Sequence, residues 1–233
     1  EMGMYLGLPA IVGRSKKKML EFIKDRLKTK IKGWKGKFLS TTRKEVMLKS
    51  VLAAIPTYAL SCFQLLDGLC KEITSLSSNF WWGQTEDKRK MHFLFEKWIK
   101  MQMGKIICDS KSRGGLGFRD LKAFNMALLA KQAWCILSYP DSLLARVLKS
   151  KYFPHSTFRD ASTSSTGSWI WRSILWGKDL LVTGLRWRIS DGKNINVWTD
   201  SWIPRNNGFT PKSIQMQNNL DHKVADLIDE DTH

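Results

Sequence analysis

The feature that most constrains the fold of this chain is an apolar stripe in its first third. Apolar side chains recur there at steps of three and four residues, which is the period of one face of an α-helix. The stripe consists of Leu20, Ile23, Leu27, Ile31 and Trp34. We therefore expect an amphipathic helix that begins near Ser15, and the glycines at Gly33 and Gly36 end it.

Two more helical segments follow. The spacing of Thr42 and Glu45 predicts a capping box, in which the glutamate reaches back to the N–H of the capping residue. Pro56 then stops or kinks the second helix. A further helix is expected over residues 69–82. Residues 15–82 are thus predicted to form a small helical bundle.

The second half of the chain is also expected to be mostly helical. The glycines of residues 114–117 predict a tight turn, and Asp120 is placed to cap the helix that follows over 121–137. Asp141 is expected to cap another helix, which ends at Tyr152.

A third helix in this half is expected over residues 169–181. The period then changes to two over Arg186–Ser190 and again over Lys193–Trp198, with Asp191-Gly192 between the two runs. This pattern is typical of a β-hairpin. The predicted fold class is therefore mainly α, with a C-terminal β-hairpin.

Positive charge is concentrated on the first helices. The 233 residues carry a formal net charge of +17, and between Arg14 and Lys49 the sequence has 14 Lys and Arg against 3 Asp and Glu, a difference of +11. Lys17, Lys24 and Lys28 lie off the apolar stripe and are expected to face outward. A solvated helix face is the usual fate of such a run. The scarcity of acids favours phosphate binding instead.

The residue pattern excludes most catalytic chemistry. The 4 Cys and 4 His form no C-x-x-C pair and no cluster, so no metal site is predicted. The aspartates are scattered at expected caps and turns, and the 114–117 glycines lack the spacing of a phosphate-binding loop. We expect no catalytic residue and no complete active site in the chain. With no signal peptide and no long apolar run, we expect an intracellular protein, nuclear or cytoplasmic, with no membrane partner.

Two aromatic clusters offer another route to nucleic acid. Residues 80–82 (Phe-Trp-Trp) and the tryptophans Trp169, Trp171 and Trp176 could stack on bases. Their helical spacing favours a place in the core.

Several ordered strings carry a family resemblance. They are YLGLP (5–9), GRSKK (13–17), KEVMLKSV (44–51), AIPTY (54–58), FWWG (80–83), GGLGFRDL (114–121), AW (133–134), KYFP (151–154), WRSI (171–174), WRI (187–189) and WTDSWIP (198–204). In this order they resemble the plant LINE-type (non-LTR) retrotransposon reverse transcriptases, whose members are also labelled ribonuclease H proteins. The resemblance spans residues 5 to about 204.

The resemblance implies that the chain is part of a longer RNA-directed DNA polymerase. In that family the palm with its Asp-Asp motif precedes the YLGLP string, and the zinc-binding segment and ribonuclease H domain follow the WIP string. The chain would then hold the end of a palm-like segment (1–14), a thumb-like bundle (15–82), a variable linker (83–113), a connection region (114–204) and an acidic, loosely ordered tail (205–233).

Within the linker, Lys97–Asp109 looks like an insertion relative to the family. The implied partners are RNA and DNA as a template–primer duplex, with no small-molecule substrate. The chain itself is expected to need no cofactor, although the intact polymerase would use Mg²⁺.

The resemblance and the charge pattern together suggest contact residues. The phosphate contacts would come from Arg14, Lys16, Lys17, Lys18, Lys28, Lys30, Lys32, Lys35, Lys37, Arg43 and Lys49, and the residues near the primer end would be Tyr5, Leu6 and Gly7. Such contacts position a duplex without reading its sequence. Two alternatives remain open: a retroelement-derived nucleic-acid-binding protein without enzymatic activity, and a relic without function.

Overall fold

The computed structural model shows a mainly helical chain that divides into two compact units, Glu1–Leu180 and Leu181–His233. The residues that the structure describes are 4–5, 8–9, 16–34, 39–53, 57–81, 108–162, 167–204, 211 and 222–228. Within them lie seven α-helices, so the expectation of a mainly α fold is confirmed. Near the start of the chain, β1 (Met4–Tyr5) and β2 (Leu8–Pro9) form a short antiparallel pair.

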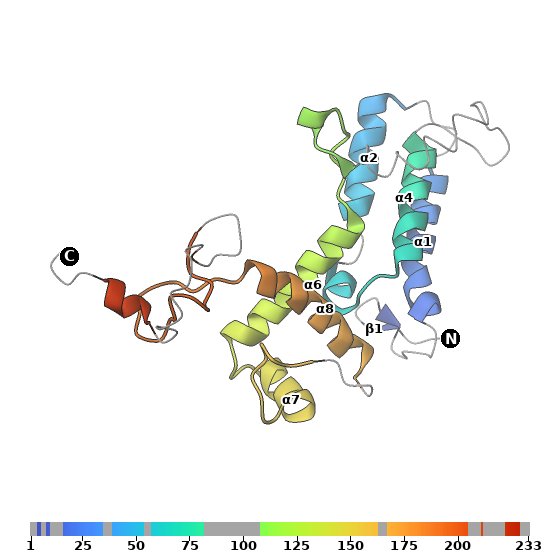
Figure 1. Cartoon of the computed structure of the whole chain (residues 1–233). Helices are drawn as coiled ribbons and strands as arrows, with labels where there is room; N and C mark the ends of the chain where they lie inside the picture. Colours follow the sequence, from blue (N-terminus) through green and yellow to red (C-terminus); the bar gives the residue numbers. More distant parts are fainter. Residues whose placement is uncertain are drawn as a thin grey trace. The chain divides into compact units, whose positions relative to one another are not determined.

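Three long helices form the first part of unit 1. They are α1 (Lys16–Lys32), α2 (Thr41–Ala53) and α4 (Asp67–Trp81), and α1 and α2 each pack against α4 and against one another. Figure 1 shows α1 and α4 running alongside each other. The bounds of α1 and α4 confirm the helices that the apolar spacing predicts.

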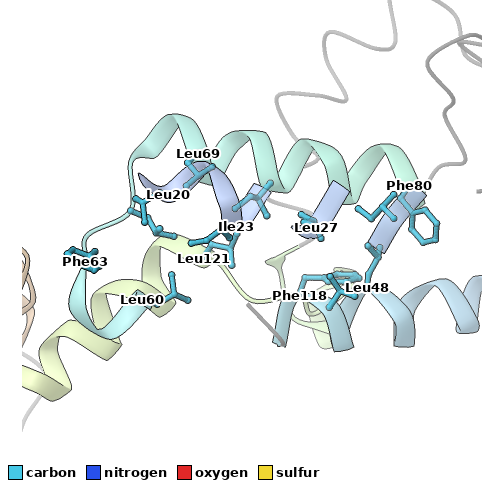
Figure 2. Close-up of a cluster of buried hydrophobic side chains, with 14 residues drawn as sticks. Leu20, Ile23, Leu27, Leu48, Leu60, Phe63, Leu69, Phe80, Phe118 and Leu121 are labelled. Atoms are coloured by element: carbon cyan, nitrogen blue, oxygen red, sulfur yellow. The ribbon is translucent and has the colours of Figure 1, made fainter. Parts of the chain in front are cut away.

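The apolar stripe lies inside this group of helices. Leu20 is fully buried, and Ile23, Leu27 and Ile31 are no more than 6% exposed. They share one cluster with residues from α2, α3 (Thr57–Cys62), α4 and the start of α6 (Leu121–Ser138), as Figure 2 shows. Burial of such a stripe is the main source of stability for an amphipathic helix.

The predicted capping box on α2 is wrong. The helix begins at Thr41, so Ser40 is the residue before its first turn, and its Oγ accepts the N–H of Arg43 at 3.3 Å. Glu45 turns to Lys49 and Lys111 instead. The pattern of Thr42 and Glu45 misled because Thr42 lies two positions after the residue that caps the helix, Ser40.

The glycine turn before α6 has the predicted form. It follows a single turn of 3-10 helix, η1 (Lys111–Arg113), and Gly114 and Gly117 have φ of 80° and 65°. Such left-handed conformations favour glycine. Asp120 then caps α6, because its carboxylate accepts the N–H groups of Lys122 and Ala123 at 2.8 and 3.1 Å.

Two more helices follow α6 along the chain. They are α7 (Leu143–Tyr152) and α8 (Trp169–Gly184). Ser142 caps α7, not Asp141 as expected, since the Ser142 Oγ accepts the N–H of Ala145 at 3.3 Å. An added Cβ at Gly177 on α8 would lie 2.4 Å from the backbone of Leu129 on α6, so the two helices meet at that glycine.

The predicted β-hairpin of unit 2 is not formed. The two runs do not pair with each other: the N–H of Trp187 donates to the carbonyl of Ser201 at 2.8 Å, while residues 195–197 pair with residues 222–224. The N–H of Val197 donates to the carbonyl of His222 and that of Val224 to the carbonyl of Ile195, each at 2.9 Å. Each run therefore takes a partner from farther along the chain, which the local Asp-Gly signal cannot reveal.

Part of the segment that was expected to be a loosely ordered tail contributes to this unit. Val224, in the short 3-10 helix η2 (Val224–Leu227), is 3% exposed and forms a small apolar cluster with Ile195 and Val197. Gly192 has φ of 68°, and an added Cβ there would lie 2.5 Å from the backbone nitrogen of Ala225. Of the linker predicted over 83–113, residues 83–107 lie outside the described residues, and residues 111–113 form η1.

Candidate nucleic-acid interface

Helix α1 carries three lysines that are free to meet a ligand. Lys28, Lys30 and Lys32 are exposed, and among the residues that the structure describes none of them forms an ion pair. Lys28 and Lys32 are four residues apart and share one side of the helix, while Lys30 lies on the opposite flank. The cations thus border the outer surface of α1 on both sides.

Lys24 does not belong to this outward set, contrary to the expectation from the sequence. Its Nζ donates to the Glu72 carboxylate on α4 at 2.7 Å and lies 3.7 Å from Glu21, and its side chain is only 15% exposed. The hydrogen bond to Glu72 raises the pKa of Lys24. This lysine joins two helices and is not available to a phosphate.

Helix α2 contributes one exposed cation and two that are engaged, of which Lys44 donates to the carbonyl of Trp81 at 3.3 Å. Arg43 is exposed in the first turn. Lys49 lies 2.8 Å from Glu45 and places its Nζ 5.4 Å from the centre of the Phe118 ring. Lys111, from η1, also contacts Glu45, at 2.7 Å.

The contacts from Lys111 and then Lys49 lower the pKa of Glu45 from 4.5 to about 2. One carboxylate thus serves two ammonium groups. The cluster keeps one uncompensated positive charge at the junction of α2 and the glycine turn. Lys111 was not foreseen as a member, because only the folded turn brings it to α2.

The remaining predicted contacts lie partly outside the described residues. Lys16, Lys17 and Lys18 form the first turn of α1 and Tyr5 lies in β1, but their side chains are not among those described. The same holds for the whole of Arg14, Leu6, Gly7, Lys35 and Lys37. The structure therefore places Lys28, Lys30, Lys32 and Arg43 on two helices that pack together.

Most described members of the aromatic clusters lie in the core or pack against it, as their spacing favours. Trp171 is fully buried and stacks on Tyr152 with 4.7 Å between ring centres, and Phe80 is 9% exposed. Trp169 packs on Phe63 at 4.6 Å. Trp82 lies outside the described residues.

Metal-binding side chains do not converge in the part of the chain that the structure describes. Within it, no group of three or more His, Cys, Asp or Glu side chains is placed to hold a metal ion. No helix in that part is both long and apolar enough to cross a membrane.

Comparison with known proteins gives a close relative. The chain is 48% identical over 151 residues to "Uncharacterized mitochondrial protein AtMg00310" of Arabidopsis thaliana, and the match covers 64% of this chain and 93% of that protein. The chain belongs to the family of this protein. A second relative is "Putative ribonuclease H protein At1g65750" of the same plant. The present chain is 33% identical to it over 199 residues.

The two matches differ in what they cover. The second spans 84% of this chain but only 31% of the ribonuclease H relative, so the chain corresponds to about a third of that longer protein. The AtMg00310 match, by contrast, covers nearly all of a short protein. No protein-family model and no solved structure matches the chain.

Proposed function

We propose that this chain is a nucleic-acid-binding part of a non-LTR retrotransposon reverse transcriptase. This part binds the backbone of a template–primer duplex and carries no polymerase chemistry itself. The observation that carries the proposal is the exposure of the lysines on α1. Lys28, Lys30 and Lys32 are exposed on a helix whose opposite face is buried in a well-packed core. A duplex would meet these charges on a fixed scaffold and not on a flexible basic tail.

The distribution of acids supports the same function. Of the three acids in the basic region, Glu21 and Glu45 pair with lysines, whereas Asp25 forms no ion pair among the described residues. The outer cations keep their charge for an anion. Contacts of this kind release counterions, so the logarithm of affinity falls with the logarithm of salt, with a slope of roughly −0.9 per phosphate neutralised.

A binding experiment with matched variants tests the proposal. The triple change Lys28→Gln, Lys30→Gln and Lys32→Gln should weaken binding of a labelled RNA–DNA duplex. It should also make the salt slope shallower by about one for each phosphate that is no longer neutralised. The control changes Lys71, Lys131 and Lys149, three exposed lysines outside α1 and α2, to glutamine. It removes the same charge and should leave the slope near that of the wild type. Equally weakened binding in both variants would mean that only net charge matters.

The absence of polymerase chemistry is tested separately. In the resembled family the catalytic aspartates precede the segment that matches residues 5–9. We expect no primer extension when the chain is incubated with template, primer, nucleotides and Mg²⁺. Any extension above the level of a mock preparation would refute this part of the proposal.

A second candidate is a free-standing nucleic-acid-binding protein derived from a retroelement. The near-complete coverage of the short Arabidopsis protein supports it, because this region then also occurs without the rest of a polymerase. The two candidates differ in what restores activity. Adding a catalytic part from a related polymerase should produce extension under the first and none under the second.

A further inference from the structure

Trp187 in unit 2 stands out from the other tryptophans. Among the described residues only Trp134 and Trp187 are exposed tryptophans, at 47% and 48%, although burial is the usual place for a side chain of this size. Trp187 lies between Arg186 and Arg188, both exposed. We propose that Trp187, with the neighbouring Arg188, forms a stacking site for an unpaired base of single-stranded nucleic acid.

The backbone beneath the ring is held in place. The N–H of Trp187 donates to the carbonyl of Ser201 at 2.8 Å. Trp202, which follows Ser201, donates its Nε1–H to the carbonyl of Val197 at 2.9 Å. Val197 is part of the apolar cluster of this unit. The backbone that carries the exposed indole is therefore held in place, so little backbone freedom remains to be lost when a base stacks on the ring.

The charged residues close to Trp187 in the sequence suit a nucleotide. Arg188 and Lys193 form no ion pair among the described residues of unit 2. The carboxylates of Asp191 and Asp200 keep their charge but accept backbone N–H groups instead of pairing with these cations. Asp191 accepts the N–H of Lys193 at 3.3 Å, and Asp200 accepts that of Asn196 at 2.8 Å. The guanidinium of Arg188, next to the indole in the sequence, can bind a phosphate that flanks a stacked base.

A protein partner fits this surface less well. Tryptophan and arginine are frequent at protein interfaces, where they sit in a desolvated, well-packed centre. Here the ring is followed by exposed polar residues at Ser190, Asp191, Lys193 and Asn194. Apart from Ile189, which is 38% exposed, the exposed surface after the ring is polar and charged and lacks the apolar surround of a protein interface.

The test uses the whole chain and three labelled probes: a single-stranded oligothymidylate, an abasic strand of the same length and charge, and an RNA–DNA duplex. Trp187→Ala should weaken binding of the oligothymidylate by about tenfold and leave binding of the abasic strand unchanged. Trp187→Phe, which keeps an aromatic face, should retain most of the affinity.

Trp134→Ala is the matched control, because Trp134 has the same exposure but lies on α6 between Ala133 and Cys135. It should bind all three probes like the wild type, and unchanged thermal unfolding of both alanine variants would exclude misfolding as a cause. The inference is overturned if the wild type does not bind the oligothymidylate, or if Trp187→Ala binds it normally. It is also overturned if Trp187→Ala weakens binding of the abasic strand as much as it weakens binding of the oligothymidylate.

The two proposals can fail separately. Loss of duplex binding in the Lys28, Lys30 and Lys32 variant tests the α1 surface only. Dependence on the base at Trp187 tests unit 2 only.

Discussion

Asn125 and Leu65 are joined by a buried hydrogen bond in which the backbone N–H of Leu65 donates to Oδ1 of Asn125 at 2.9 Å. The amide nitrogen of the same asparagine donates to the carbonyls of Leu60 and Phe63 at 2.6 and 2.9 Å. Asn125 is 1% exposed and lies on α6. One side chain therefore satisfies three backbone groups around the bend between α3 and α4 and holds that bend against α6.

Replacing this asparagine should be costly. Asn125→Leu would leave one buried N–H and two buried carbonyls without partners, and each such group costs about 1–3 kcal/mol. Allowing for partial relaxation, we expect the free energy of unfolding to fall by about 3 kcal/mol, measured by urea denaturation. Lys131→Ala, on the exposed side of the same helix, should change it by less than about 0.5 kcal/mol. A similar small change at Asn125 would show that the bend is held by other contacts.

Gly177 should tolerate no side chain. An added Cβ would lie 2.4 Å from the backbone of Leu129 and 2.5 Å from that of Ala130. Backbone atoms of a packed helix move only together, so Gly177→Ala should destabilise the chain by about 1–3 kcal/mol. Gly184, in the same helix, has nothing within 4 Å of the added atom, and Gly184→Ala should be neutral or slightly stabilising. Thermal unfolding of the two variants makes the comparison, and equal melting temperatures would contradict the close crossing.

Glu45 should make stability depend on pH in the acid range. Its pKa is about 2 in the folded chain against 4.5 without its lysine partners. Because the folded pKa is the lower one, the contribution is present above pH 4.5 and is lost as the pH falls toward 2. Glu45→Gln should remove this part of the pH dependence of urea unfolding. Lys111→Gln, which removes the larger cause of the shift, should reduce it as well. A wild-type pH profile in both variants would show that the cluster does not form.

Substitutions at Lys24 and Lys28 should have separate effects, one on stability and the other on nucleic-acid binding. Lys24→Gln breaks the bond to Glu72 between α1 and α4 and should lower the melting temperature with little effect on duplex affinity. Lys28→Gln, at an exposed position, should do the reverse. Melting curves and duplex titrations on the two single variants decide this, and identical behaviour of the pair would contradict the assignment of different roles.

The helices could be predicted because the residues that determine each helix lie within the helix itself or directly beside it in the sequence. The spacing of Leu20, Ile23, Leu27 and Ile31 predicts both the existence of α1 and the face that it buries. The same holds for Asp120, whose carboxylate caps the helix directly after it.

The errors arose where distant residues decide the structure. Lys24 seemed to face solvent because its partner, Glu72, lies on another helix. The Asp191-Gly192 pair does coincide with a turn, but residues 222–224 and Ser201 provide the hydrogen bonds that a hairpin would have supplied. Glu45 is part of a lysine cluster, and not of a cap, because the turn at Lys111 folds back onto α2.

The pairing of residues 195–197 with residues 222–224 has a consequence for synthesis on the ribosome. Residues 195–197 are synthesised before their partner, and until it follows Ile195 and Val197 can pack only on Trp198 and Trp202 and lack Val224. Unit 1 can complete its helix packing while translation continues, since its partners all precede residue 181. Unit 2 becomes able to close only when the ribosome has released the residues around Val224. Any pause in translation between the two segments would therefore prolong the exposure of these apolar side chains on the nascent chain, where they could associate with other proteins.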